Sequence, residues 1–256
     1  MNVRDLPLQG KTALVTGSSR NLGASIASHL ASQGARVVLT FHDSPDEARA
    51  VIDQLGDQAD RGHIAIACDL TSSAGVRDMV AEALEKLDAP IDILVNNVGL
   101  WAGDPLVELS DTDWDMVLNT NVKAAFVTSQ LLGSRMRESG WGRIVNISGG
   151  SAYVRNHSVY GLAKAAVGFL TEELAVELAP EVTVNAVAPG QIAESAEEAE
   201  AVMPGFVEAA IAQTPARRLV TRVEVARLVG ALCTDRFPLV TGVTIPIDGG
   251  WRFHRP

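Results

Sequence analysis

Short apolar runs alternate with longer amphipathic stretches along most of the chain. The runs are rich in β-branched residues and have the length of buried strands, at 12–16, 36–41, 63–68, 91–97, 143–148 and 182–187. A further run, 243–250, has the character of a last strand that enters a turn. The intervening stretches carry apolar residues at helical spacing, at 21–33, 45–55, 73–87, 111–138 and 159–179.

This alternation indicates the fold class. Strands that alternate with helices favour right-handed βαβ units and a parallel sheet covered on both faces. We therefore predict an α/β fold, a Rossmann-type doubly wound parallel sheet of about seven strands with helices on both faces. No linker rich in proline, glycine or serine and no internal repeat divides residues 1–256, which predicts a single domain.

Residues 191–214 interrupt the alternation. They contain no strand, and the sequence "AESAEEAEAVMPGF" is first acidic and then apolar. By composition alone this is a solvated surface helix. The segment follows the carboxyl end of the sixth predicted strand, however, and open α/β sheets bind ligands at that end. We therefore predict a substrate lid here.

Composition excludes several classes of function. An apolar share of 47% is enough for a sizeable core, and a net charge of -10 argues against binding to nucleic acid. The two cysteines, Cys68 and Cys233, give neither a disulfide framework nor a metal-binding pattern, so no metal site is predicted. No window has the roughly 18 uninterrupted apolar residues of a membrane span, and the first residues do not form a signal peptide. We expect a cytoplasmic protein without membrane association.

A glycine-rich turn follows the first predicted strand and leads into a helix. In "TGSSRNLG" (16–23), Gly17 allows a sharp turn and Gly23 allows the helix to approach the sheet. The helix N-terminus then offers free N–H groups and the positive end of its dipole to a diphosphate. In this context the turn predicts a dinucleotide site.

Residues after the second predicted strand bear on the choice of dinucleotide. An enzyme that selects NAD usually has a carboxylate there to hold the ribose 2′-hydroxyl, whereas this chain has Phe41. Arg20 and His42 are placed to meet a 2′-phosphate instead. Asp43 is the counter-evidence, because a small shift in register would make it an NAD-type carboxylate. We predict NADP(H) in preference to NAD(H).

Tyr160 and Lys164 lie four residues apart at the start of a predicted helix, so they share one helical face. A carbonyl that accepts hydride becomes an alkoxide and needs a proton from a positioned acid. A free phenol has a pKa near 10, and a neighbouring ammonium favours phenolate, so we expect Lys164 to lower the pKa of Tyr160. The pair predicts proton transfer by Tyr160, although Tyr-x3-Lys also occurs by chance in many helices.

Further motifs accompany this pair in a recognisable order. They are "CDL" (68–70), "NNVG" (96–99), "NTNV" (119–122), "YGLAK" (160–164), "NAVAPGQI" (185–192) and "TGVTIPIDGG" (241–250). With the glycine turn, they make nearly the full length of the chain resemble the short-chain dehydrogenase/reductase family, and within it ketoreductases similar to 3-oxoacyl-[acyl-carrier-protein] reductase.

The resemblance implies roles for residues that alone have ordinary structural explanations. Asp69 and Leu70 would contact the adenine, and Asn97 and Gly99 would line the adenosine ribose. The cofactor-binding residues expected in this way, together with those of the turn, are Gly17, Ser19, Arg20, Asn21, Leu22, Gly23, His42, Asp69, Leu70, Asn97, Gly99, Tyr160, Lys164, Pro189, Gly190 and Ile192.

The resemblance also implies the groups around the nicotinamide. Pro189, Gly190 and Ile192 would fix its carboxamide face, and Lys164 would hydrogen-bond its ribose. Asn121 would hold a water molecule that relays protons to Lys164. Each has an alternative explanation, Asn121 as a buried amide and Pro189-Gly190 as a simple turn.

The chain departs from the family pattern at three places. Asn21 replaces a glycine of the turn, and asparagine tolerates unusual backbone angles. Glu194 replaces a hydroxyl residue that helps to hold the diphosphate. A carboxylate near phosphate is unfavourable unless it points away, so we expect the lid to start differently here. Gly149 stands where the catalytic serine is expected, and the connection to Tyr160 is about two residues short. Ser148 is the residue we predict as its substitute; Ser151, or no residue, is the alternative.

These observations predict an NADPH-dependent ketoreductase acting on a small-molecule carbonyl or secondary alcohol. Trp101, Tyr153 and His157 suggest aromatic walls that suit a flat or cyclic ketone, or they merely pack the loops. The alternatives are reduction of a C=N bond in a pterin or imine, and a dinucleotide-binding sensor without turnover. The family resemblance implies a homotetramer or dimer formed through the long helices and the last strand.

Overall fold

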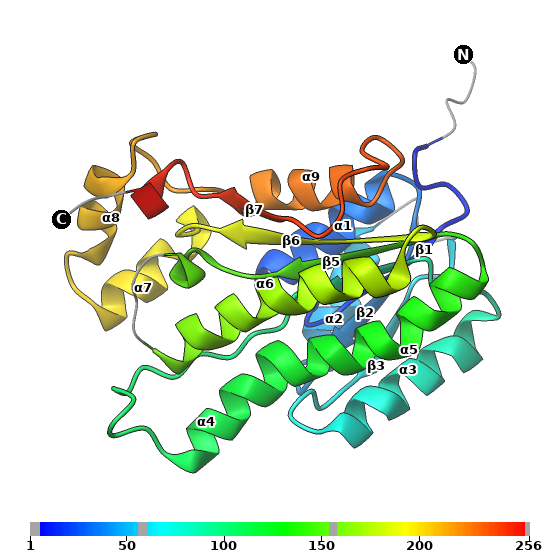
Figure 1. The fold of residues 1–256 in the computed structure, drawn as a ribbon, viewed down its shortest axis with the longest axis horizontal. Coiled ribbons are helices and arrows are strands. Elements are labelled where there is room, and N and C mark those ends of the chain that lie inside the picture. The colour runs from blue at the N-terminus through cyan, green and yellow to red at the C-terminus, as the bar shows by residue number, and fades with distance from the viewer. Residues whose placement is uncertain (1–5, 56–60, 154–157, 254–256) are drawn as a thin grey trace.

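The computed structural model describes residues 6–55, 61–153 and 158–253 (Figure 1). Seven parallel strands form one sheet in the order β3-β2-β1-β4-β5-β6-β7. The order reverses direction at β1, which places β1 beside β4 and opens a crevice at the carboxyl ends of these strands. The predicted fold class is confirmed. The strands are β1 (Thr12–Val15), β2 (Arg36–Phe41), β3 (Ile64–Ala67), β4 (Ile93–Asn96), β5 (Gly142–Ile147), β6 (Val182–Pro189) and β7 (Thr244–Ile247).

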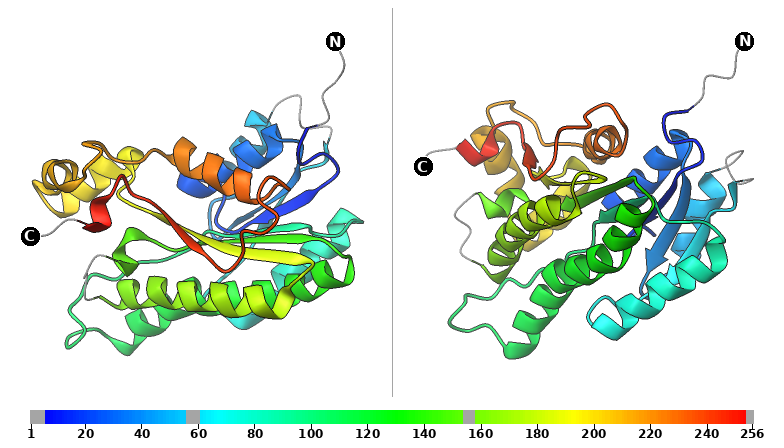
Figure 2. Two further views of the ribbon diagram at one scale, coloured as in Figure 1. Left: turned by 45° about the horizontal axis from the view of Figure 1, so that its top comes forward. Right: turned by 45° about the vertical axis from the view of Figure 1, so that its right-hand side comes forward.

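Helices cover both faces of the sheet (Figure 2). On one face α1 (Asn21–Ser32), α2 (Pro45–Gln54) and α9 (Arg222–Leu232) close a core that includes Ile26, Leu30 and Val229. On the other face α3 (Ser73–Leu87), α5 (Ala124–Glu138) and α6 (Val159–Leu178) close a second core. The central strands β1, β4, β5 and β6 are buried along their length, which explains why their sequences are largely apolar.

The helices differ from the sequence prediction in three places. The stretch 111–138 is helical but divides into α4 (Asp111–Leu118), the π-helix η2 (Asn119–Lys123) and α5. The segment 191–214 contains the 3-10 turn η4 (Ala193–Ser195), α7 (Ala196–Val202) and α8 (Phe206–Gln213). Helix α9 was not predicted, although a capping box between Thr221 and Glu224 marks its start. The helices of 191–214 lie beyond the carboxyl end of β6 (Figure 1).

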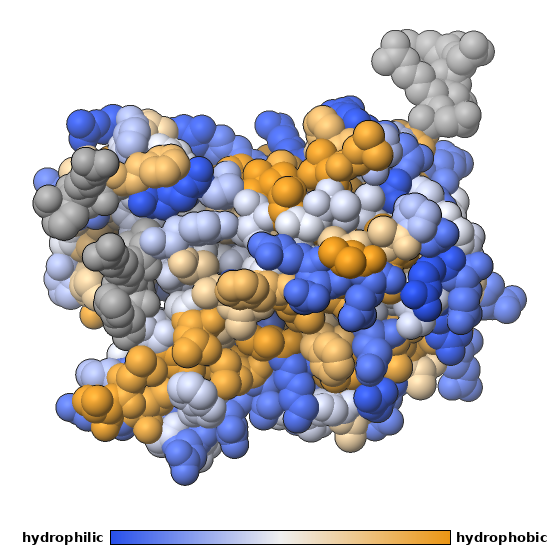
Figure 3. All heavy atoms as spheres, in the orientation of Figure 1, coloured by the Kyte–Doolittle hydropathy of each residue, from blue (hydrophilic) through white to orange (hydrophobic). Residues whose placement is uncertain are grey.

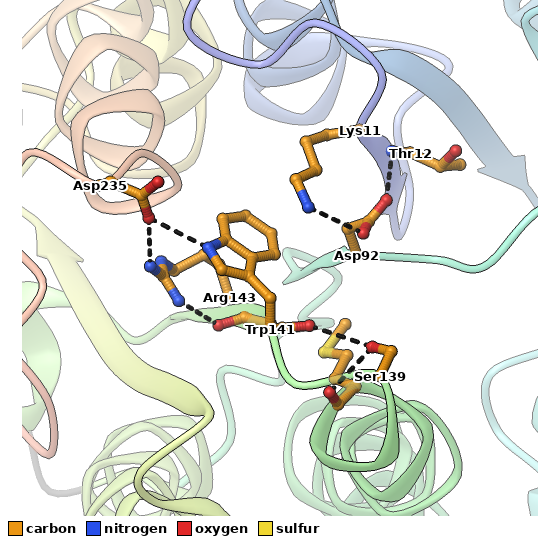
Figure 4. A network of polar contacts seen from close by, with 9 residues as sticks. Lys11, Thr12, Asp92, Ser139, Trp141, Arg143 and Asp235 are labelled. Carbon is orange, nitrogen blue, oxygen red and sulfur yellow. Dashed lines mark hydrogen bonds and ion pairs between the residues drawn. The ribbon is translucent and has the colours of Figure 1, made fainter.

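A charged network fastens the opposite, amino-terminal edge of the sheet (Figure 4). The indole of Trp141 lies between two cations, with Lys11 Nζ 3.9 Å and the Arg143 guanidinium carbon 4.3 Å from its ring centre. Asp235 accepts hydrogen bonds from Trp141 Nε1 at 3.0 Å and from Arg143 Nη2 at 2.6 Å. Lys11 Nζ donates to Asp92, whose other oxygen accepts from the backbone of Thr12. This network connects β1, β5 and the end of α9 away from the site.

Large apolar side chains are exposed beside the carboxyl edge. Figure 3 shows a broad hydrophobic area at the lower left, where Figure 1 places α4 and the chain before it. The exposed apolar residues between β4 and the middle of α4 are Leu100, Trp101, Leu106, Val107 and Trp114.

Among the described residues, no helix combines the length and the apolar character that are needed to cross a membrane.

Candidate active site

A cleft of about 520 Å³ opens at the carboxyl ends of β1, β2, β3 and β4. It brings together most of the predicted cofactor residues: Gly17, Ser19, Arg20, Asn21, Leu22, Gly23, His42, Asp69, Leu70, Asn97 and Gly99. It is also lined by residues that were not assigned to the cofactor: Thr40, Phe41, Asp43, Ser44, Cys68, Thr71, Val98, Leu100 and Thr120. The predicted residues Tyr160, Lys164, Pro189, Gly190 and Ile192 do not line this cleft.

The glycine turn has the tight geometry expected from its sequence. Gly17 has φ +59°, and a Cβ there would stand 2.4 Å from Val98 Cγ2. A Cβ on Gly23 would stand 2.1 Å from the carbonyl oxygen of Gly17, so only glycine fits. Asn21 adopts φ 53°, the left-handed conformation that asparagine tolerates. The substitution of the middle glycine therefore leaves the turn intact.

Thr40 and Ser18, which sequence reasoning missed, brace this turn together with the predicted Asn97. Thr40 Oγ1 accepts from the backbone N–H of Gly17 at 3.0 Å, and the backbone N–H of Thr40 donates to Ser18 Oγ at 3.1 Å. Asn97 Nδ2 donates to the carbonyl oxygens of Thr16 and Gly17 at 2.9 and 3.2 Å. The available signal for Thr40 was a single hydroxyl at the end of an otherwise apolar strand.

The start of α1 fits a diphosphate. Its N-cap residue, Arg20, makes no side-chain capping hydrogen bond, and its first turn contains no acidic residue. The free N–H groups and the positive end of the helix dipole therefore face the cleft, as an anion site requires. Together with the glycine turn (16–23), the start of α1 fits a dinucleotide.

Basic and acidic groups meet at the ribose end of the cleft. Arg20 Nη1 lies 3.5 Å from Glu47 Oε2, and both side chains are largely exposed. Asp69 Oδ1 accepts from the backbone N–H and the hydroxyl of Thr71 at 2.8 and 2.6 Å. These two hydrogen bonds are the main reason that the pKa of Asp69 is lowered, and the nearby His42 adds to the effect. The Asp69 carboxylate is thus already hydrogen-bonded to Thr71 in the turn that follows it.

The predicted pair Tyr160 and Lys164 lies in the first turns of α6. The helix begins after Ser158, whose hydroxyl accepts from the backbone N–H of Gly161 at 3.1 Å. Lys164 is 2% exposed, and its Nζ donates to the carbonyl oxygen of Ile147 at 2.9 Å. The same nitrogen lies 5.3 Å from the centre of the Tyr160 ring. The structure therefore brings phenol and amine together beside the end of β5.

The protonation of this pair differs from the prediction. We expected the ammonium of Lys164 to lower the pKa of Tyr160. Instead, burial raises the pKa of Tyr160 to about 12 and lowers the pKa of Lys164 to about 7. The reason is that loss of water disfavours both charged forms, and the hydrogen bond from Nζ goes to Ile147. At neutral pH the tyrosine keeps its proton.

Asn121 comes from the π-helix η2 and points toward the lysine. Its Nδ2 donates to the carbonyl oxygens of Leu100 and Val117, both at 2.9 Å. Its Oδ1 is buried and has no hydrogen-bond partner among the residues described. A Cβ on Gly99 would stand 2.3 Å from this oxygen and 2.7 Å from Lys164 Nζ, so Gly99 leaves the space between them open. The widened turn of a π-helix often marks a functional position.

Comparisons with known proteins agree with this geometry. The family model described as Enoyl-(Acyl carrier protein) reductase matches residues 17–252. The 3-oxoacyl-[acyl-carrier-protein] reductase FabG of Aquifex aeolicus is 36% identical over 251 residues, covering 96% of this chain and 99% of that protein. A short-chain type dehydrogenase/reductase from Mycobacterium marinum superposes with a TM-score of 0.85 at 32% identity, covering 98% of this chain and 99% of the other.

The chain belongs to the short-chain dehydrogenase/reductase family. It is also similar to a blue fluorescent protein from a metagenomic library, solved in complex with NADPH. The TM-score is 0.87 and the identity 33%, covering 96% of this chain and 99% of the other.

The end of β6 and the chain just after it carry Pro189, Gly190 and Ile192, which were predicted to contact the nicotinamide in this short-chain dehydrogenase/reductase. Gly190 donates its backbone N–H to the carbonyl oxygen of Ile247 at 3.0 Å, and a Cβ on it would stand 2.9 Å from Asp248 Cα. Ile192 pairs with Val220 in an isolated parallel bridge. The segment from Pro189 to Ile192 is therefore fixed by its neighbours at the start of the predicted lid.

The carboxylate of Glu194 is bound at the N-terminus of α9. Both of its carboxylate oxygens accept from the backbone N–H of Arg222 at 3.1 Å, and Arg222 is the first residue of α9. The carboxylate is thus stabilised at a helix N-terminus. It ties the start of the 191–214 segment to α9.

Ser148 is placed differently from the role predicted for it. Its side chain is 3% exposed, and its Oγ donates to the carbonyl oxygen of Lys164 at 2.8 Å. Ser151 Oγ is buried without a hydrogen-bond partner among the described residues. Of the two serines that the sequence analysis considered, only Ser151 has a hydroxyl without a hydrogen bond to the described residues.

Of the predicted aromatic walls, Tyr153 lines a second pocket together with Ser148 and Lys164. Trp101 lies over Gly103, where a Cβ would stand 2.3 Å from its Cη2, and its side chain is exposed. Tyr153 is also exposed, and the Arg252 guanidinium carbon lies 5.7 Å from its ring centre. The third predicted aromatic, His157, lies outside the described residues.

Proposed function

We propose that this chain is an NADPH-dependent ketoreductase that reduces a small-molecule carbonyl to a secondary alcohol. The observation that carries the proposal is the set of a partly buried Tyr160 with the buried Lys164 and Asn121, beside a cleft that fits a dinucleotide. When bound, the dinucleotide supplies the hydride. Tyr160 gives its proton to the carbonyl oxygen, and Lys164 and Asn121 restore that proton through a water molecule.

The protonation states place the proton where reduction needs it at the start. Because burial raises the pKa of Tyr160 to about 12, the phenol holds its proton at neutral pH and can act as a general acid. Because burial lowers the pKa of Lys164 to about 7, the amine can give up and take up a proton near neutral pH. The buried Asn121 Oδ1 is an acceptor for the water molecule between them.

The basic residues of the cleft support NADPH rather than NADH. Arg20 and His42 both line it, and a guanidinium is suited to bind a phosphate. Asp43 also lines the cleft and opposes this choice, because a carboxylate repels a 2′-phosphate. Arg20 is mobile enough to turn from Glu47 to a ligand, since both side chains are largely exposed.

Two further proposals concern the lid and the assembly. The segment 191–214 acts as a substrate lid, since it follows the carboxyl end of β6 and its start is tied to α9. The protein forms a homotetramer or dimer, because Phe169 and Val176 on α6 are 71% and 78% exposed. The molar mass in solution, measured by light scattering, tests the assembly, and a monomer would contradict it.

A tyrosine variant tests the proposed chemistry. We expect Tyr160→Phe to abolish nearly all consumption of NADPH with a panel of ketones, because phenylalanine has no proton to give. Its dissociation constant for NADPH, measured by fluorescence, stays close to that of the wild type. Tyr153→Phe is the matched control, since it removes a phenol but keeps the aromatic ring that lines the neighbouring pocket, and we expect it to retain turnover.

The outcomes separate the enzyme from a sensor. Binding of NADPH without turnover on any carbonyl by the wild type would indicate a dinucleotide-binding sensor. Turnover retained in Tyr160→Phe would show that another group supplies the proton.

A further inference from the structure

We propose that Ser151 supplies the hydroxyl that binds the carbonyl oxygen of the substrate, in place of the serine that the family pattern expects at position 149. This inference rests on the proposed reduction and names one more catalytic residue for it. The Ser151 hydroxyl donates a hydrogen bond to the oxygen while Tyr160 donates the proton.

The first observation is the position of the Ser151 hydroxyl. A Cβ on Gly149 would stand 3.3 Å from Ser151 Oγ, 3.6 Å from Lys164 Cγ and 3.8 Å from the phenolic oxygen of Tyr160. The space that a side chain at position 149 would enter is therefore adjacent to both the serine hydroxyl and the phenol. Ser151 reaches this space from two residues further along the chain.

A local turn explains how Ser151 arrives there. Residues Gly150–Ala152 form the 3-10 helix η3, closed by a hydrogen bond from the backbone N–H of Ala152 to the carbonyl oxygen of Gly149 at 3.1 Å. A 3-10 turn directs the chain back over its own start within three residues. Gly150 permits the turn to pack closely, because a Cβ there would stand 3.1 Å from Trp251. A connection shortened by about two residues can thus return a hydroxyl to the same place.

The second observation is that the hydroxyl has no partner. Ser151 Oγ is buried, and among the described residues no group accepts from it or donates to it. A buried hydroxyl without a hydrogen bond costs free energy, so such a group in a folded protein calls for a partner such as a ligand or an ordered water molecule. A carbonyl oxygen is an acceptor that satisfies it.

The competing serine is already engaged. Ser148 Oγ donates to the carbonyl oxygen of Lys164 at 2.8 Å and is almost fully buried. A hydroxyl has one proton to donate. Ser148 would have to break this bond with α6 before it could bind a substrate oxygen, whereas Ser151 breaks nothing.

The chemistry makes the Ser151 hydrogen bond catalytic. As hydride reaches the carbonyl carbon, the C=O π electrons move to oxygen and negative charge develops there. A donor aimed at that oxygen stabilises the charge more in the transition state than in the ground state. The proton that finally stays on oxygen comes from Tyr160, so Ser151 keeps its own.

Three variants test this assignment through the reduction of a ketone by NADPH. We expect Ser151→Ala to lose about 10²–10³-fold in kcat, the usual effect of removing one such donor. Its dissociation constant for NADPH, measured by fluorescence, does not change. The double variant Gly149→Ser/Ser151→Ala regains most of kcat, because position 149 has an extended backbone, φ -170°, and the removed oxygen leaves room for the new side chain. Ser134→Ala, on the exposed side of α5, is the matched control and keeps kcat.

Thermal unfolding supplies a readout that does not depend on activity. Ser151→Ala removes an unsatisfied buried hydroxyl, so its Tm equals or exceeds that of the wild type. Ser148→Ala breaks the bond to Lys164 and lowers Tm.

The possible results separate the role of Ser151 from the proposed ketoreductase function. If the wild type reduces a ketone and Ser151→Ala keeps the wild-type kcat, the role of Ser151 is refuted while the ketoreductase stands. A large loss of kcat in Ser148→Ala alone, with NADPH binding intact, would assign the role to Ser148. A wild type that reduces no carbonyl would overturn the proposed function and this inference with it.

Discussion

Lys164 offers the sharpest test of how burial controls the site. Burial lowers its pKa from 10.5 to about 7, which corresponds to about 5 kcal/mol. In the unfolded chain the amine keeps its proton up to a pH near 10.5, so between about pH 7 and pH 10.5 the unfolded state binds more protons than the folded state. The free energy of unfolding contributed by this group therefore rises with pH across that window.

Lys164→Met removes the buried amine and keeps a side chain of similar length. The lost hydrogen bond from Nζ to Ile147 costs about 1 kcal/mol, which is less than the relief from burying a charge. We expect the variant to be more stable than the wild type by about 3 kcal/mol near pH 7, with the difference shrinking as pH rises. The raised pKa of Tyr160 destabilises both proteins equally at high pH and cancels in the difference.

Denaturant unfolding of the two proteins at a series of pH values measures this difference. Lys86→Met is the matched control, because Lys86 is half-exposed and pairs with Glu82 on the surface of α3. Its stability should follow that of the wild type at every pH. Parallel profiles for Lys164→Met and the wild type would show that Lys164 does not titrate near neutral pH, and would refute the reasoning on burial.

Three more variants test separate parts of the structure. Arg20→Ala should raise KM for NADPH about tenfold or more, because one charge-assisted contact to the 2′-phosphate is lost. KM for NADH should stay unchanged, and equal effects on both cofactors would contradict this. Gly190→Ala should lower Tm and weaken NADPH binding, because its Cβ would stand 2.9 Å from Asp248 Cα; a wild-type Tm would show that the backbone yields easily. Asp235→Asn should destabilise the fold by about 1 kcal/mol in denaturant unfolding, since buried Arg143 loses its ion pair, with kcat unchanged because the network lies at the opposite edge; a fall in kcat would contradict that separation.

The sheet and most of the cofactor cleft could be predicted because their signals are local. A strand buried on both faces is expected to be mostly apolar, and runs such as 36–41 and 182–187 are rich in apolar β-branched residues. The glycine turn is equally direct, because Gly17 and Gly23 occupy positions that no larger residue fits. The carboxyl ends of adjacent parallel strands then bring His42, Asp69 and Asn97 into the same cleft.

The parts that could not be predicted depend on contacts between distant segments. The hydroxyl of Ser148 is engaged by a carbonyl oxygen sixteen residues later in the chain, and only the packing of α6 on β5 reveals this. Whether the pKa of Tyr160 is raised or lowered depends on how much water remains around the phenol. The spacing of residues along the sequence does not show this. Helix α9 lacks a strand before it, so the alternation that marks the other helices gave no signal there.

The most direct test of the central claim follows the hydride itself. NADPH carrying deuterium on the transferred position of the nicotinamide is incubated with the protein and a ketone, and the product alcohol is examined by mass spectrometry. We predict one deuterium on the former carbonyl carbon with the wild type and almost no alcohol with Tyr160→Phe. An alcohol without deuterium, or equal product from both proteins, would contradict the claim that Tyr160 and a bound dinucleotide perform the reduction.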